Sequence, residues 1–248
     1  MANPMTRRVW LSPRIILVLA MLTGLGTVFL HDVPTKVTAE DRDYASRILT
    51  AAGYPGHAEA YGDLNGFDGQ VRAALAVQDA VLGATPKSEG LPLGQAREPH
   101  DVFEARQGLC FDRSRVIEKM LGHLGLETRH LSVFSTKDGR SKLSAMLGDT
   151  TKSHAVSEVR TARGWMLVDS NARWIGLDAS RQPVDAASLH NAAIAVGPWA
   201  PESTAKLNRI FTGPFTFVIG LYSRHGRFYW PYTPVPDYNL GQLVQNVW

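Results

Sequence analysis

The sequence predicts an α+β domain in which a helix that begins at a lone cysteine packs on an antiparallel sheet, behind an apolar N-terminal segment. Three observations predict this class. Apolar side chains at helical spacing follow Cys110, apolar residues alternate in several later segments, and residues 15–30 are apolar without interruption. With 248 residues, of which 44% are apolar, the chain can bury a core of its own. We therefore expect one folded domain after the N-terminal segment.

Residues 1–33 are predicted to be an N-terminal signal anchor. Their apolar run, "IILVLAMLTGLGTVFL", is a little shorter than the roughly 20 residues of a bilayer-spanning helix. Because Arg7, Arg8 and Arg14 precede the run, the positive-inside rule keeps the N-terminus in the cytoplasm. We expect a single-pass protein of a bacterial inner membrane, with residues 34–248 on the periplasmic, extracytoplasmic side. Secretion after cleavage of a signal peptide is the alternative.

The charge of the chain gives no reason to expect a nucleic-acid partner. The formal net charge of +3 equals the contribution of the three N-terminal arginines, and the remaining sequence carries 23 basic and 23 acidic side chains. The single cysteine excludes an intramolecular disulfide and any metal centre with several cysteine ligands. A functional Cys110 is therefore a nucleophile, a lone metal ligand or a redox sensor, and the alternative is a buried small side chain.

Two helices are predicted before the cysteine. The first follows a cap at Thr38, has acidic residues in its first turn, and is stopped by Gly53 and Pro55. The second is "DGQVRAALAVQDAVLGA", which Gly83 and Pro86 interrupt. The next segment, "TPKSEGLPLGQAREPHD", is rich in proline and glycine and predicts a surface loop that leads to the cysteine.

The helix that follows the cysteine has one apolar face and a glycine stop at Gly125. That face consists of Val116, Ile117, Met120, Leu121 and Leu124. Cys110 therefore lies at the helix N-terminus or one residue before it. Backbone N–H groups and the positive end of the helix dipole favour a thiolate there, and the same N–H groups can hold an oxyanion. The position favours a nucleophile over a cysteine that only fills space.

A base for this nucleophile is predicted in a β-hairpin. "ETRHLSVFST" predicts one strand, and "SHAVSEVRT" and "GWMLVDSNARW" predict a hairpin that turns at residues 162–164. His154 opens the first hairpin strand and Asp169 closes the second, so pairing brings them close. A carboxylate there would hold the imidazole tautomer while the other ring nitrogen faces the thiol. The alternative is a strand-end histidine and a turn-capping aspartate.

Other polar residues are expected to be structural. His123 and His130 are placed on a helix surface and a strand, and no spacing resembles a metal site. Glu158 and Arg160 are expected on the solvated edge of the hairpin, although Glu158 shares the face of His154.

The C-terminal region is the most aromatic part of the chain. Alternation over residues 215–221 predicts a strand, "SRHGR" a turn, and Phe228, Tyr229 and Trp230 a return before a proline-rich tail. Sheet core is the favoured role of these aromatic residues. The alternative is that Tyr229, Trp230 and Tyr232 wall a cleft.

The cysteine and hairpin motifs resemble the transglutaminase-like superfamily, a papain-related group, over residues 103–175. "GLCFDRSRVIEKMLGHLGLETRH" is similar to its cysteine-helix block, and "SHAVSEVRTARGWMLVDSN" to its histidine strand and Gly-Trp-x-x-x-Asp strand. The resemblance implies Cys110 as nucleophile, His154 as general base and later acid, and Asp169 as the orienting residue. The chain departs from the family in having "HAV" for His-Ala-Trp and "DSN" for Asp-Pro-Thr.

The predicted oxyanion site departs from the family as well. No tryptophan lies between Trp10 and Trp165, so the indole donor of animal transglutaminases is absent, and Gln107 is a candidate side-chain donor.

Residues 34–248 are accordingly predicted to be a papain-like, transglutaminase-like domain with an aromatic C-terminal extension. The expected function is thiol-dependent acyl transfer at an amide bond of an envelope peptide, protein or polymer, with hydrolysis favoured over transamidation. No cofactor or metal is implied. The alternatives are a non-catalytic binding module and a membrane-tethered partner of an envelope or polysaccharide assembly.

Overall fold

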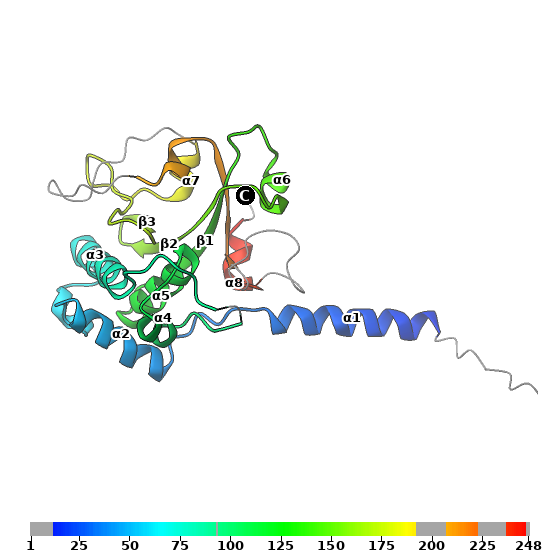
Figure 1. The fold of residues 1–248 in the computed structure, drawn as a ribbon, viewed down its shortest axis with the longest axis horizontal. Helices are drawn as coiled ribbons and strands as arrows, with labels where there is room; N and C mark the ends of the chain where they lie inside the picture. The colour runs from blue at the N-terminus through cyan, green and yellow to red at the C-terminus, as the bar shows by residue number, and fades with distance from the viewer. Residues whose placement is uncertain (1–11, 93, 192–206, 223–236, 247–248) are drawn as a thin grey trace, which may run out of the picture.

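The computed structural model describes residues 12–92, 94–191, 207–222 and 237–246 (Figure 1). Four helices gather on one side of a four-stranded sheet, and α7 lies on the other side (Figure 1). The four helices are α2 (Ala39–Ala51), α3 (Phe67–Ala84), α4 (Pro99–Ala105) and α5 (Cys110–His123). The predicted α+β class is therefore confirmed.

The sheet is antiparallel throughout, with strand order β3-β2-β1-β4. Its members are β1 (Thr128–Ser135), β2 (Ser153–Thr161), β3 (Gly164–Asp169) and β4 (Phe215–Ile219). The apolar residues of α2, α3 and α5 form one core cluster with β2 and β3, and α7 (Ala186–Asn191) closes a second cluster on the opposite face. Because β1 and β2 are central strands covered on both faces, nearly every residue of both is buried.

Local sequence signals account for the helix boundaries. Thr38 caps α2, since its hydroxyl accepts the Asp41 N–H at 3.1 Å while the Asp41 carboxylate accepts the Thr38 N–H at 2.8 Å. In α5 the predicted apolar face is buried, with Val116, Ile117 and Met120 each 0% exposed. Both findings confirm the predicted helices.

Two boundaries differ from the prediction. The proline-rich segment before the cysteine is not all loop, because α4 begins at Pro99, where proline suits the first helical position. The strand predicted over 215–221 is divided at Gly220, whose φ of +74° turns the chain, so that β5 (Leu221–Tyr222) pairs with β6 (Asp237–Tyr238) in a separate sheet. The predicted return through Phe228, Tyr229 and Trp230, with Tyr232, lies outside the described residues.

The remaining helical elements are short. They are α6 (Lys142–Leu147), α8 (Leu240–Leu243) and the 3-10 turn η3 (Val244–Asn246). Two further 3-10 turns are η1 (Ala58–Tyr61) and η2 (Arg209–Thr212).

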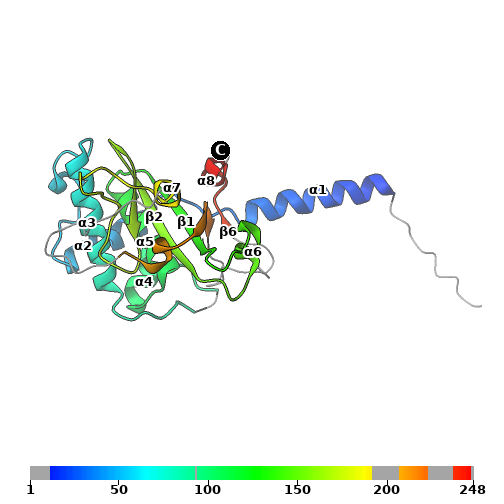
Figure 2. The same cartoon turned by 90° about the horizontal axis from the view of Figure 1, so that it is seen from above.

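The N-terminal helix α1 (Pro13–Leu30) extends away from the domain in both views (Figures 1 and 2). Ser12 caps it, and large apolar side chains such as Leu17 and Leu22 are exposed along it. Within the described ranges, no helix meets the length and apolarity of a membrane span. The signal anchor therefore stays a prediction.

Candidate active site

The lone thiol lies in the first turn of α5. The helix begins at Cys110 after the N-cap residue Leu109, and Cys110 is partly exposed. Asp112 fixes this start, because its fully buried carboxylate accepts the Leu109 N–H at 2.8 Å and lies 2.8 Å from Nε of Arg97. Burial raises the pKa of Asp112, against the opposing effect of these partners. The helix start predicted for Cys110 is confirmed.

The hairpin brings His154 and Asp169 together. Val156 pairs with Asp169 across β2 and β3, so His154, two residues earlier on the same face, is the diagonal neighbour of Asp169. His154 Nε2 lies 3.0 Å from Asp169 Oδ2, and the two side chains are 3% and 0% exposed. The contact joins the end of one strand to the start of the other, as the predicted register requires.

Backbone contacts fix the carboxylate of Asp169. Its second oxygen, Oδ1, accepts the N–H groups of Asn171 at 2.7 Å and Ala172 at 2.9 Å. From α3, the amide of Gln78 donates to the carbonyl oxygens of Asp169 at 2.8 Å and Trp174 at 2.7 Å. The carboxylate thus has one oxygen held by the turn and the other directed at the imidazole.

His154 connects the carboxylate to the thiol. Since Nε2 faces Asp169, Nδ1 is the ring nitrogen left for the hydrogen bond with Cys110. Burial alone would lower the pKa of His154, but the charge and hydrogen bond of Asp169, together with the contact to Cys110, raise it to about 10. The arrangement therefore favours an imidazolium at neutral pH. The structure brings the three predicted site residues together at the N-terminus of α5.

Arg113 is a neighbour of this group that sequence reasoning missed. It follows Cys110 by three residues in α5 and is 5% exposed. Its Nε donates to Thr85 Oγ1 and its Nη1 to Asn171 Oδ1, each at 2.9 Å. Spacing of three places two helical residues on one side, which was the available signal, but the partners lie 28 and 58 residues away in sequence.

The candidate oxyanion donor Gln107 is engaged elsewhere through one of its N–H groups. Its Nε2 donates to the Gly90 carbonyl at 3.0 Å. The backbone N–H of Cys110, in the first turn of α5, is a candidate donor, since the first turn of an α-helix leaves its N–H groups without intrahelical partners.

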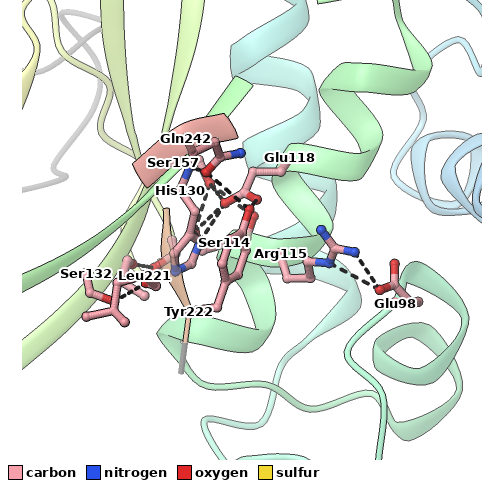
Figure 3. A network of polar contacts seen from close by, with 12 residues as sticks. Glu98, Ser114, Arg115, Glu118, His130, Ser132, Ser157, Leu221, Tyr222 and Gln242 are labelled. Carbon is pink, nitrogen blue, oxygen red and sulfur yellow. Dashed lines mark hydrogen bonds and ion pairs between the residues drawn. The ribbon is translucent and has the colours of Figure 1, made fainter. Parts of the chain in front are cut away.

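One expectation about polar residues was wrong, namely that Glu158 lies on the solvated edge of the hairpin. His130 lies on strand β1, as expected, and is 1% exposed, with Nδ1 lying 2.6 Å from Glu118 Oε1 (Figure 3). Glu158 is 0% exposed, pairs with Arg129 at 2.6 Å and accepts the Ala186 N–H at 2.7 Å. Both residues belong to central strands, whose two faces are covered. Arg160 is exposed, as predicted.

The described ranges hold no group of three or more histidine, cysteine or acidic side chains arranged to bind a metal ion. The groups near Cys110 are a base, a carboxylate, a guanidinium and helix N–H groups, and these are suited to acyl transfer through a thiol.

The family comparison covers the segment that carries this site. Residues 64–170 match the model of the transglutaminase-like superfamily core. This segment is similar to the core of the transglutaminase-like superfamily. It runs from before α3 to Ser170 and contains Cys110, His154 and Asp169.

Other comparisons add little. The crystal structure of "a Putative Cysteine Protease from Cytophaga hutchinsonii" is a distant structural match with 12% sequence identity and a TM-score of 0.32. The match covers 83% of this chain and 64% of that protein, so the chain spans less than two thirds of its length. No curated protein matches the chain significantly.

Proposed function

We propose that this protein catalyses thiol-dependent acyl transfer at an amide bond, with Cys110, His154 and Asp169 as its triad. The observation that carries the proposal is the position of His154, which hydrogen-bonds Asp169 through one ring nitrogen and faces Cys110 with the other. This order of nucleophile, base and orienting carboxylate is the general arrangement for activating a weak nucleophile.

The first half of the reaction forms a thioester. Cys110 Sγ, as the thiolate, attacks the carbonyl carbon of the substrate amide, and the carbonyl π electrons move to oxygen. Backbone N–H groups of the first turn of α5 stabilise this oxyanion. The His154 imidazolium then gives its proton to the amide nitrogen, the C–N bond breaks, and the amine leaves.

The second half restores the enzyme. Neutral His154 takes a proton from a water molecule, whose oxygen attacks the thioester carbon, and the carboxylic acid and the Cys110 thiolate are released. Transfer to an amine in place of water gives the transamidation variant. Hydrolysis is favoured because Cys110 is partly exposed and water reaches it.

The proposed substrates are peptides or proteins of the cell envelope. Cys110 packs against an apolar cluster that contains Phe111 of α5 and Phe134 of β1, which supports a substrate with an apolar group beside the cleaved amide. The envelope assignment depends on the N-terminal segment, whose arginines and apolar run support an inner-membrane anchor with the domain outside.

Intact-mass spectrometry tests the reaction. The full chain is incubated with casein and with envelope-type peptides of alternating chirality, and the covalent adduct and the cleaved products are followed. We expect an acyl adduct on the native protein, cleaved products in solution, and neither with Cys110→Ser. Slow, ordinary alkylation of Cys110 by iodoacetamide, together with no cleavage, would favour a non-catalytic binding module.

Fusion reporters test the location. Alkaline phosphatase joined after Trp248 should be active, a cytoplasmic reporter at the same point should be inactive, and the full chain should stay with membranes through a carbonate wash. An inactive phosphatase fusion contradicts the orientation. A shortened soluble product keeps the compartment and replaces the anchor by a cleaved signal peptide.

A further inference from the structure

A buried cation lies beside the proposed nucleophile. The guanidinium of Arg113 is bound by neutral acceptors: Thr85 Oγ1 at 2.9 Å, the Thr85 carbonyl at 3.0 Å, and Asn171 Oδ1 at 2.9 Å. Longer contacts reach the Lys87 carbonyl at 3.4 Å and Ser88 Oγ at 3.3 Å. Over the described part of the chain, no carboxylate lies within ion-pair distance of this guanidinium. The other buried arginine of α5, Arg115, has such a partner in Glu98 at 2.7 Å.

A buried charge without an ion pair is costly, so its retention needs a reason. The negative groups that lie near Arg113 without an ion-pair contact are Cys110, Asp112 and Asp169. Asp112 already faces Arg97 at 2.8 Å. The anions left for Arg113 to balance are therefore the Cys110 thiolate and the Asp169 carboxylate, the two anions of the proposed triad.

The hydrogen bonds of Arg113 also hold the triad in place. One edge of the guanidinium is bound to Thr85, the C-cap residue that follows α3, and the other edge is bound to the side chain of Asn171. The Asn171 backbone N–H in turn donates to Asp169 Oδ1 at 2.7 Å. A rigid, planar fork can join two such anchors at once, whereas a lysine ammonium lacks that geometry.

We propose that Arg113 is a positioning residue for acyl transfer, with its charge stabilising the Cys110 thiolate beside the His154 imidazolium and its fork holding the turn that orients Asp169. This inference rests on the proposed function of the triad. The two contributions are separable, because lysine keeps the charge and loses the fork, while glutamine loses the charge.

Alkylation of Cys110 measures the charge contribution without a substrate. Iodoacetamide reacts with the thiolate, so the rate against pH reports the thiolate fraction. In Arg113→Gln we expect the midpoint of this profile to move up by about one pH unit, because a nearby positive charge is lost. In Arg113→Lys the midpoint should stay within about 0.3 pH unit of the native value. The control Arg115→Gln removes a buried arginine two residues along α5 and should leave the midpoint unchanged.

Turnover measures the fork contribution. Arg113→Lys and Asn171→Ala should each lower kcat roughly tenfold on the substrate found by mass spectrometry, with native alkylation midpoints. An unshifted midpoint in a folded Arg113→Gln overturns the charge role. If that variant does not fold, native turnover in both Arg113→Lys and Asn171→Ala overturns the proposal.

Failure of the proposed function has a different signature. In that case the native protein itself alkylates as an ordinary free cysteine, and the peptides either are not cleaved or are cleaved equally by the native chain and by Cys110→Ser. The Arg113 test compares variants with the native profile, so the two failures are distinguishable.

Discussion

Among the residues that the structure describes, two pairs of a histidine and a carboxylate are buried on both sides, and they differ in what surrounds them. His154 and Asp169 approach to 3.0 Å across the β2–β3 hairpin, and Cys110 lies beside the imidazole. His130 and Glu118 approach to 2.6 Å between β1 and α5, farther along the same helix (Figure 3). Each histidine is at most 3% exposed. Residue type and burial therefore do not separate the two pairs.

The second pair is surrounded by hydroxyl groups instead of a thiol. Glu118 accepts hydrogen bonds from Tyr222 at 2.8 Å, from Ser157 at 3.2 Å and from Ser114 at 3.3 Å. Burial and the charge of Glu118 raise the pKa of Tyr222 well above 10, so its hydroxyl stays a donor. This network joins α5 to β1, β2 and β5, and its arrangement indicates a structural role.

Removal of the thiol beside the first pair gives the largest expected loss of cleavage activity. Cys110→Ser should abolish cleavage, a loss of at least about 10³-fold, because the hydroxyl is a far weaker nucleophile beside the same base. The free energy of unfolding should change by less than about 0.5 kcal/mol, since the substitution is small and the site partly exposed. Peptide cleavage and urea unfolding measure the two quantities. Retained cleavage would remove Cys110 as the nucleophile.

Changes in the first pair come next. His154→Ala should lower kcat/KM by roughly 10³-fold, because the proton carrier is lost. Asp169→Asn should cost less, because orientation of the imidazole is secondary to proton transfer and the proton carrier remains. Steady-state cleavage by purified variants, with circular dichroism to confirm folding, gives the order. The reverse order points to a different base.

A change in the second pair should affect stability and leave the chemistry intact. Glu118→Gln removes the charged acceptor that His130 and Tyr222 share, and we expect the free energy of unfolding to fall by about 2 kcal/mol. The kcat/KM of the folded fraction should stay within about twofold of the native value, because the side-chain hydrogen bonds of this pair go to Ser114, Ser157 and Tyr222 and not to the triad. Urea unfolding and cleavage assays check both. A large loss of cleavage in a folded variant would assign a chemical role to the second pair.

The smallest expected effect is a shift in pH dependence. Burial lowers the pKa of His154, but the Asp169 carboxylate and the contact to Cys110 raise it to about 10, so the alkaline limb of kcat/KM should follow the loss of the imidazolium proton near that pH. Asp169→Asn removes the charge, and the limb should move down by about one to two pH units. Glu118→Gln is the control and should leave the limb in place.

The raised pKa of His154 also makes the free energy of unfolding fall as the pH rises. A histidine pKa raised from 6.5 to about 10 contributes stability that is fully present below pH 6.5 and is lost as pH rises through about 10. The native protein should therefore lose stability between these limits, and Asp169→Asn should lose less. Urea unfolding at several pH values across this interval measures the difference, and parallel curves for the two proteins would contradict the assignment.

The sequence by itself determined the elements and the relative placement of the triad residues. The apolar stripe of α5 and the glycine stop at Gly125 specify a helix that begins at Cys110, since the period of a helix is a local property. Alternation and the turn predicted at residues 162–164 specify the hairpin, and antiparallel pairing then brings His154 near Asp169. These features depend only on residues that are close in the chain or paired across one turn.

Only the tertiary structure decided which polar side chains are buried and what they contact. Glu158 was expected on the solvated edge of the hairpin, but β2 is a central strand of the sheet and Glu158 is 0% exposed. Arg113 meets Thr85 and Asn171 across separations of 28 and 58 residues. Such contacts depend on how α3, α5 and the end of β3 pack together, and local periodicity carries no information about that packing.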